Sequence, residues 1–142
     1  MKTDVKGSST IIPALRYNDA VSAIDWLCEA FGFEKHLVVP DEDGGIAHAQ
    51  LVLGNGMIML GSARDDAFGQ LQQPLRSMDA PVSQSIYIVV PDVDAHHQHA
   101  NACGAKIITP PEDQDYGGRL YTCRDQEGYL WNFGSYDPWE PV

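Results

Sequence analysis

Cysteine and long apolar runs are scarce in this sequence of 142 residues. Its three cysteines lie far apart and form no CxxC pair, which argues against a disulfide framework or a zinc knuckle and favours reduced thiols. No apolar run approaches the ~20 residues of a membrane span, and the polar first nine residues lack the apolar core of a signal peptide. We therefore expect a cytoplasmic protein with no membrane partner.

Basic side chains are also few, since 9 lysines and arginines stand against 20 acidic residues and give a formal net charge of −11. Such a surface repels nucleic-acid phosphates, so we expect no nucleic-acid partner. It suits cationic ligands, although an acidic surface also simply keeps a protein in solution. The charge alone names no ligand.

The second half of the chain repeats the first at a fixed spacing. Four anchor residues in the first half recur 73 positions later: Gly44, Gly45, Gly61 and Ser62 return as Gly117, Gly118, Gly134 and Ser135. A chain that folds one unit twice tends to place its working site where the copies face each other. The length suits one domain made of two modules.

Each repeat has the pattern of a βαβββ module. The first predicts strands at 10–16, 33–40, 46–53 and 57–62, with a helix from a cap at Asn18 or Asp19 to Gly32. The second predicts strands at 84–90, 106–109, 119–124 and 129–134, with a helix from Asp92 or Asp94 to Gly104. Asn55-Gly56 predicts a hairpin in which both turn residues have positive φ. The modules span about 9–62 and 83–136, and 63–82 is a linker or a lid.

Strand alternation predicts which side chains face a ligand. In the first module we expect Ala47, Ala49 and Leu51 to pack beneath the helix, leaving His48, Gln50, Met57 and Met59 on the ligand side. In the second we expect Leu120, Trp131 and Phe133 in the core and Tyr121, Cys123, Leu130 and Asn132 on the ligand side. The expected fold is α+β, with both modules forming one curved, cup-shaped mixed sheet and the helices packed outside.

The tandem βαβββ pattern, the segment at 116–122 and the stretch RDQEGYLWNFG at 124–134 together resemble the vicinal oxygen chelate superfamily. This group includes glyoxalase I, extradiol dioxygenases, fosfomycin-resistance transferases and bleomycin-resistance proteins. The resemblance covers about residues 9–136. It implies binding of a small molecule, usually by a homodimer.

The resemblance also implies four metal-ligand positions in the metal-dependent members, on the first and last strand of each module. Here these positions map to Pro13, Met59, Ile86 and Asn132. Proline and isoleucine offer no donor atom, a thioether is too soft for the usual ions, and an asparagine amide is a weak ligand. We therefore expect no metal ion and no other cofactor.

These observations favour a metal-free protein of the bleomycin-resistance type that sequesters a cationic or aromatic compound. An alternative is a lyase, isomerase or dioxygenase-like enzyme that uses His48 as a general base or holds a metal at a non-standard site, such as His48 with Gln50. A scaffold with an empty cup is a third reading. His48 and Gln50 also suit a polar network that binds no selected ligand, and Met57 and Met59 also suit plain packing.

Five further side chains carry weaker expectations. Arg119 suits an anionic group near the cup or an ion pair with an acid such as Glu112. Cys123 would need a base to act as a nucleophile, and His48 is the candidate. His96 and His99 have the i, i+3 spacing of a nickel or zinc pair, but a solvated helix face is the simpler reading. Trp139 lies beyond the last strand and either closes over the pocket or packs a tail.

Overall fold

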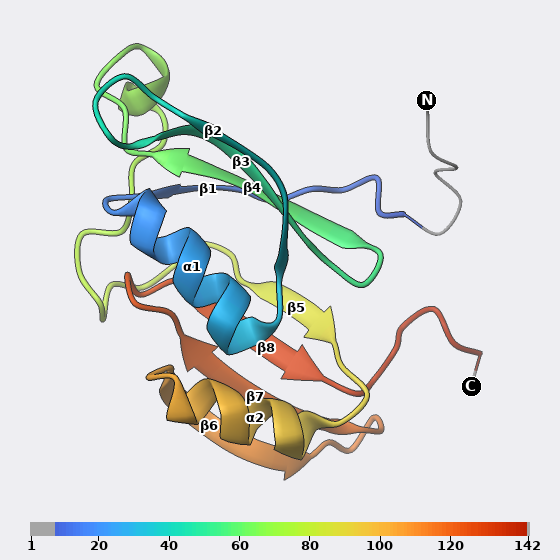
Figure 1. Ribbon diagram of the computed structural model, residues 1–142. Coiled ribbons are helices and arrows are strands. Elements are labelled where there is room, and N and C mark those ends of the chain that lie inside the picture. The colour runs from blue at the N-terminus through green and yellow to red at the C-terminus, as the bar shows by residue number, and fades with distance from the viewer. Residues whose placement is uncertain (1–7, 142) are drawn as a thin grey trace. The chain divides into compact units, whose positions relative to one another are not determined.

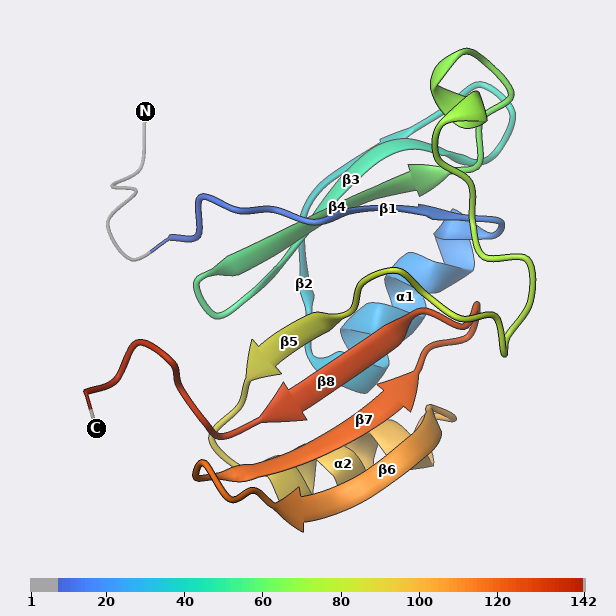
Figure 2. The ribbon, with the colours of Figure 1, turned by 180° about the vertical axis from the view of Figure 1, so that it is seen from behind.

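The computed structural model describes residues 8–141 and divides after Pro74 into two compact units. Each unit consists of one α-helix packed on a four-stranded mixed sheet (Figures 1 and 2). The α+β class and the tandem βαβββ modules are thereby confirmed. The division falls inside the segment predicted as a linker or lid.

The first unit has the sheet order β1-β4-β3-β2, in which β1 runs parallel to β4 and the other neighbours are antiparallel. Its elements are β1 (Ala14–Tyr17), α1 (Ala20–Phe31), β2 (Glu34–Pro40), β3 (Ile46–Leu53), β4 (Gly56–Ser62) and the 3-10 helix η1 (Phe68–Gln70).

The second unit repeats this topology with the order β5-β8-β7-β6, and β5 runs parallel to β8. Its elements are β5 (Ile86–Val89), α2 (Val93–Ala102), β6 (Lys106–Asp113), β7 (Arg119–Arg124) and β8 (Leu130–Gly134). The helix α2 lies in front of β6 and β7 in Figure 1 and behind them in Figure 2, so it covers one face of this sheet.

The two helices begin at equivalent aspartates. The Asp19 carboxylate accepts a 3.1 Å hydrogen bond from the Ser22 amide, and Asp92 accepts one of 3.0 Å from Ala95. Each satisfies an amide that has no partner inside the helix. The helix α1 ends at Gly32, whose φ of 94° only glycine adopts readily. Within residues 8–141, no helix combines the length and hydropathy that a membrane span requires.

The hairpin between β3 and β4 differs from the predicted one. Leu53 pairs with Gly56, so the two turn residues are Gly54 and Asn55 rather than Asn55 and Gly56. Gly54 has a φ of 59°, and no residue other than glycine has a positive φ within the described chain. The turn therefore has glycine at its first central position, where a turn of type II′ requires it.

Two strand boundaries differ from the predicted ones by four residues each. The strand β1 begins at Ala14 rather than residue 10, and the carbonyl of Pro13 accepts a 2.9 Å hydrogen bond from the Met59 amide just before it. The strand β6 continues past the predicted end at 109 through two prolines, Pro110 and Pro111. It is an edge strand, where a missing amide donor is tolerated, and its pairing skips from Thr109 to Glu112.

Candidate functional site

The first sheet has one face packed under α1 and one face turned away from it. Ala49, Leu51, Ile58 and Leu60 are at most 3 % exposed and share the helix-facing side with the apolar stripe of α1. Because side chains alternate along a strand, the opposite side carries the residues between them. We call this side the open face of the first sheet, and its residues are His48, Gln50, Val52, Met57 and Met59.

Ala47 is the exception to the predicted alternation in this strand. It was expected beneath the helix, but it is exposed and Ile46 is buried instead. Val39 pairs with His48 and Pro40 pairs with Ile46, so Ala47 is an extra residue in a β-bulge. The bulge shifts the alternation by one residue at the start of β3.

His48 and Gln50 lie two residues apart on the open face and contact each other. The amide nitrogen of Gln50 lies 3.0 Å from Nε2 of His48. A side-chain amide NH₂ only donates, so Nε2 accepts and the imidazole carries its proton on Nδ1. Nδ1 therefore carries the N–H that can donate to a ligand, whereas Nε2 already accepts a hydrogen bond from Gln50.

The two methionines complete the open face. Met59 pairs across the hairpin with Gln50, and Met57 pairs with Val52. Both side chains are half-buried. Thioether side chains adapt to irregular apolar partners and contact aromatic rings favourably. The structure thus gathers His48, Gln50, Met57 and Met59 on one surface, and their role in binding stays a prediction.

In the second sheet the predicted faces of β7 are wrong. Tyr121 and Cys123 were expected on the ligand side, but both are 0 % exposed. Tyr121 pairs with Phe133 and Cys123 with Trp131, on the side covered by α2. Leu120, expected in the core, lies on the opposite side. The open face of the second sheet consists of Leu120, Thr122, Arg124, Leu130 and Asn132.

A one-residue slip in the repeat explains this error. Asn132 lies 73 positions after Met59, but their pairing partners Thr122 and Gln50 are 72 apart. The first unit has an extra residue at the Ala47 bulge, and the second has an extra residue in the loop between β7 and β8. Because each unit has one extra residue, the anchor glycines on either side keep their spacing of 73 positions. Equivalent residues of β3 and β7 are nevertheless only 72 positions apart. A prediction made with a spacing of 73 therefore assigns the residues of β7 to the wrong face.

Tyr121 and Cys123 are held in an apolar environment. The Tyr121 hydroxyl lies 2.6 Å from Nδ1 of His96 on α2, and its ring stacks on Phe133 at 5.3 Å. Burial raises the pKa of Tyr121 well above its ordinary value. Burial, and secondarily the charge of Asp125, raises the pKa of the Cys123 thiol to about 12. A thiol kept protonated is a poor nucleophile, so the nucleophile hypothesis for Cys123 is not supported.

Arg119 also belongs to the helix-facing side. Its guanidinium donates to Asp113 at 2.9 Å and to Asp94 of α2 at 3.2 Å. The predicted alternative of an ion pair was therefore right, although the partners are these two aspartates rather than Glu112. Its role beside a ligand stays a prediction, and α2 covers this side of the sheet.

Asn132 lies on the open face, where its side-chain amide is part of a local hydrogen-bond network. Its Oδ1 accepts a 2.8 Å hydrogen bond from Thr122, and its Nδ2 donates to the Ser85 hydroxyl at 2.9 Å and to the Ile86 carbonyl at 3.2 Å. This arrangement ties β8 to β7 and to the start of β5. Both hydrogens of Nδ2 are engaged and Oδ1 keeps a second lone pair, so the network fixes the orientation of the amide.

The residues at the predicted metal positions do not fit a divalent ion. The register places Ala14 beside Met59 and Tyr87 beside Asn132, one residue after the predicted Pro13 and Ile86. Alanine has no donor atom, and the Tyr87 hydroxyl donates to the Tyr136 carbonyl at 2.6 Å. A thioether and one neutral amide complete the set, which suits neither the borderline nor the hard ions.

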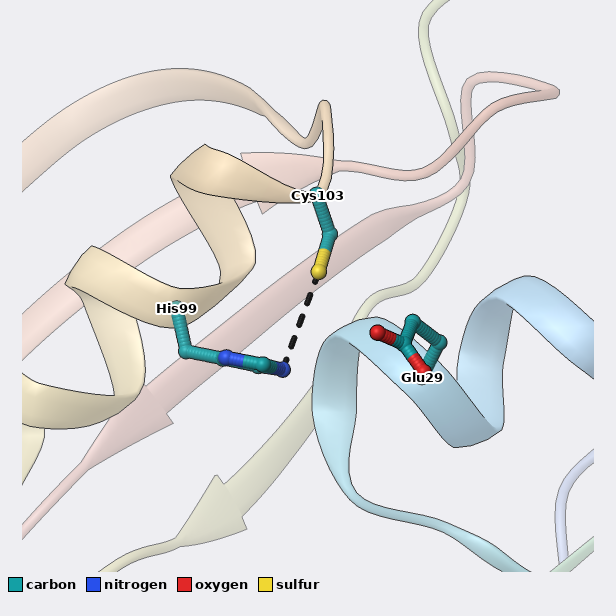
Figure 3. A group of neighbouring side chains, drawn as sticks. All are labelled: Glu29, His99 and Cys103. Carbon is teal, nitrogen blue, oxygen red and sulfur yellow. Dashed lines mark hydrogen bonds between the residues drawn. The ribbon is translucent and has the colours of Figure 1, made fainter.

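The histidines of α2 have separate surroundings rather than one solvated face. His96 is half-buried against Tyr121 and Phe133, and the His97 ring meets the edge of Tyr121 at 5.2 Å. His99 instead contacts Cys103, with Nε2 3.6 Å from Sγ (Figure 3). The predicted His96–His99 pair is therefore divided between two environments. Trp139 is 93 % exposed and neither packs a tail nor closes a pocket within its unit.

The sequence interpretation also missed a group at the end of the first sheet. Arg16 on β1 and Arg64 just after β4 both lie over the ring of Phe68, each with Cζ 5.6 Å from the ring centroid. Arg64 also pairs with Asp66, and this hydrogen-bonded guanidinium lowers the pKa of Asp66 to about 2. Because basic residues are few in this chain, Arg16 and Arg64 were the sequence feature that could have indicated this group.

Comparison with known proteins agrees with this architecture. An uncharacterized protein of Mycobacterium bovis is 36 % identical over 126 residues, which cover 86 % of this chain and 80 % of that protein. The crystal structure of TioX from Micromonospora sp. ML1 is 32 % identical, covers 89 % of this chain and 98 % of its own, and superposes with a TM-score of 0.67. A glyoxalase-related enzyme from Fulvimarina pelagi shares the fold at 14 % identity, covering 94 % of this chain and 91 % of its own with a TM-score of 0.69.

The same assignment follows from the sequence of the chain. Residues 11–133 match the sequence model of the Glyoxalase/Bleomycin resistance protein/Dioxygenase superfamily, so the match spans both modules. Together with the repeated βαβββ topology and relatives above 30 % identity, the match leads to one conclusion: this chain belongs to the Glyoxalase/Bleomycin resistance protein/Dioxygenase superfamily.

Proposed function

We propose that this protein binds a cationic or aromatic small molecule without a metal ion and protects its host by sequestering that compound. The open face of the first sheet supports this role with a polar pair, His48 and Gln50, beside two adaptable thioethers, Met57 and Met59. The net charge of −11 favours approach of a cation, and methionine sulfur favours contact with an aromatic ring.

The observation that carries the proposal is the donor set at the metal positions of the superfamily. Met59 and Asn132 lie on the open faces, but one offers a thioether and the other an amide already engaged by Thr122, Ser85 and Ile86. Binding therefore relies on shape, apolar contact and the His48 Nδ1 donor. Polarisation of a substrate by an ion is not part of the proposal.

The alternative is a lyase, isomerase or dioxygenase-like enzyme in which His48 acts as a base. A general base needs a lone pair aimed at the proton that it removes. Gln50 donates to Nε2 of His48, so the imidazole must first exchange this hydrogen bond for one to a substrate. This contact favours a binding role over a catalytic one.

Calorimetric titration tests the proposal. We expect bleomycin or N-methylquinolinium, both cations with aromatic rings, to bind at least tenfold more tightly than naphthalenesulfonate, an aromatic anion. Met59→Lys places a cation on the open face and should weaken binding at least tenfold. Val21→Lys is the matched control, because Val21 is an exposed residue of α1 in the same unit. Equal affinity in both variants, or tighter binding of the anion, would contradict the proposal.

Two further measurements separate binding from catalysis. Mass spectrometry of the bound compound after incubation should find it unchanged, whereas conversion that disappears in His48→Ala would support the enzyme. Elemental analysis after incubation with nickel, zinc, manganese or ferrous iron should find no retained ion. One ion per chain, lost in His48→Ala, would overturn the metal-free assignment. Homodimerisation stays a prediction, which light scattering tests.

A further inference from the structure

Three tyrosines gather at one end of the second sheet and stay exposed. Tyr87 lies on β5, Tyr116 in the turn between β6 and β7, and Tyr136 just after β8. All three are exposed, Tyr116 at 56 %, and the rings of Tyr116 and Tyr136 meet edge to face with 5.1 Å between their centroids. We call these three residues the tyrosine cluster. Aromatic side chains usually bury most of their surface, so a cluster left open to solvent is a candidate for contact with a ligand.

Tyr87 is held over the open face of the second sheet. It pairs with Asn132 of β8, so its side chain lies on that face. Its hydroxyl donates a 2.6 Å hydrogen bond to the Tyr136 carbonyl, and a Cβ at Gly134 would meet the same hydroxyl at 2.5 Å. Gly134 therefore leaves the space through which the Tyr87 ring reaches the segment after β8.

The backbone brings Tyr116 and Tyr136 together. The turn that contains Tyr116 is closed by a 2.8 Å hydrogen bond from the Gln114 amide to the Gly118 carbonyl. A Cβ at Gly118 would lie 2.8 Å from the amide nitrogen of Tyr136, and its φ of 76° also favours glycine. The segment after β8 can therefore pass close to the turn, and the backbone positions the two rings although neither is buried.

The first unit shows that the fold does not require these rings. Its corresponding turn is closed in the same way, by a 3.0 Å hydrogen bond from the Asp41 amide to the Gly45 carbonyl. The strand register and the anchor glycines keep the spacing of 73 positions at this end of both sheets. The residues 73 positions before the three tyrosines are Ala14, Asp43 and Ala63. The tyrosines therefore need an explanation other than folding.

The chain around the tyrosine cluster is acidic. The segments 107–118 and 135–141 contain five acidic residues and no basic one. The Asp137 carboxylate accepts a 2.9 Å hydrogen bond from the Trp139 amide, which fixes its orientation. Burial raises the pKa of Tyr87, and the neighbouring Tyr116 and the charge of Asp137 raise it further, so the Tyr87 phenol stays neutral. The cluster thus combines neutral, electron-rich rings with a negative charge.

We propose that the tyrosine cluster binds the quaternary ammonium group of a small molecule. The face of an aromatic ring attracts a cation, and aromatic cages recognise quaternary ammonium groups in this way. The planes of the Tyr116 and Tyr136 rings lie at 79°, so a rounded trimethylammonium group can contact both rings in the corner between them. Asp137 adds electrostatic attraction. The site goes beyond the proposed function, because it uses none of the open-face residues of the first sheet.

NMR titration with choline, 3,3-dimethylbutanol and ethanolamine at constant ionic strength tests this site. Dimethylbutanol keeps the shape of choline but has carbon in place of the charged nitrogen, so it should bind at least fivefold more weakly. Ethanolamine keeps the charge but holds its water more tightly, so it should also bind at least fivefold more weakly. Equal binding of choline and dimethylbutanol overturns the proposal in favour of apolar contact alone. Equal binding of choline and ethanolamine overturns it in favour of a general attraction to an acidic surface.

Variants locate the binding in the cluster. Tyr116→Leu removes an exposed ring and should weaken choline binding at least threefold, whereas Tyr116→Phe keeps the ring and should stay within twofold of the parent protein. Phe68→Leu is the matched control, because it removes an exposed ring from the first unit and should change the affinity less than twofold. No loss in Tyr116→Leu, or an equal loss in Phe68→Leu, overturns the site.

The amide shifts in the same titration separate this site from the proposed function. Choline should shift the amides of Gly117, Gly118 and Tyr136 most strongly, because they lie beside the rings. Shifts centred on β3 and β4 would instead assign choline to the open face of the first sheet. That result would support the proposed function and overturn the tyrosine site.

Discussion

The indole nitrogen of Trp131 donates a 3.0 Å hydrogen bond to Oδ2 of Asp125, the only charged side chain that is buried within residues 8–141. The other oxygen of the carboxylate accepts from the amides of Glu127 and Tyr129 at 2.9 and 3.1 Å. The loop between β7 and β8 is thus built around one carboxylate. This loop also contains the extra residue that displaces the repeat.

Asp125→Ala should destabilise the protein by about 2–4 kcal/mol, because it removes the carboxylate that accepts three hydrogen bonds, one of them from the buried indole N–H. Urea unfolding followed by circular dichroism measures this loss. Asp115→Ala is the control, since Asp115 is an exposed aspartate in the same unit and should cost less than about 0.5 kcal/mol. A loss from Asp125→Ala no larger than that from the control would show that the loop does not depend on the carboxylate.

Stability should fall in alkali because burial raises the pKa of Cys123 to about 12. Below pH ~9 both the folded and the unfolded thiol keep their proton, so the shift has no effect. Between pH ~9 and 12 the unfolded thiol ionises while the folded one does not, and the free energy of unfolding falls by about 1.4 kcal/mol per pH unit. Tyr121, whose pKa is also raised, adds to this slope above pH ~10.

Urea unfolding at several pH values between 8 and 11 measures the slope. Cys123→Ala should make it shallower, whereas Cys103→Ala, which removes a part-exposed thiol, should leave it nearly unchanged. The slope is compared rather than the stability itself, because Cys123→Ala also alters core packing. A slope that is the same in Cys123→Ala as in the parent protein would count against a buried, protonated thiol.

Local signals in the sequence predicted most elements correctly. Asp19, Asp92 and Gly32 marked helix ends because capping depends on a few neighbouring residues. The predicted ranges of β3 and β7 match the structure, and Gln50 and its partner Met59 lie on the predicted side. These features are set within one hairpin or one helix, so a short stretch of sequence contains the information.

The wrong assignment of the faces of β7 arose because it depends on how the strands pair, which involves residues farther apart in the sequence. Nothing in the alternation of Ala47, His48 and Ala49 distinguishes a bulge from a regular strand, because the misplaced residue is a small alanine that either face accepts. Four residues separate the paired Val52 and Met57, but five separate the paired Arg124 and Leu130. That difference depends on pairing, which the sequence alone does not reveal.

The turn between β3 and β4 supplies a matched pair of substitutions. Gly54 has a φ of 59°, so Gly54→Ala should destabilise the protein by about 1–2 kcal/mol. A Cβ at Gly56 would meet only the Leu53 carbonyl at 3.5 Å, an ordinary contact, and its φ is not positive, so Gly56→Ala should be nearly neutral or slightly stabilising. The reverse order of the two thermal midpoints would favour an Asn55-Gly56 turn.

The face assignment of β7 can be tested with the same substitution at two adjacent positions. Tyr121 is 0 % exposed under α2, whereas Thr122 lies on the open face and is half-buried. Tyr121→Lys buries an unpaired ammonium and removes the contacts to His96 and Phe133, so we expect it to cost more than about 4 kcal/mol or to prevent folding of the second unit. Thr122→Lys loses one hydrogen bond to Asn132, which costs about 1 kcal/mol.

The conservative variants Tyr121→Phe and Thr122→Val keep this comparison interpretable if Tyr121→Lys does not fold. Tyr121→Phe keeps the ring and removes only the contact between the hydroxyl and His96, so it should cost about 1 kcal/mol. Unfolding measured by circular dichroism should show both conservative variants folded and the two lysine variants far apart in stability. If Thr122→Lys proved the more damaging lysine variant, β7 would have the opposite face against α2, and Tyr121 and Cys123 would return to the open face as candidates for ligand contact.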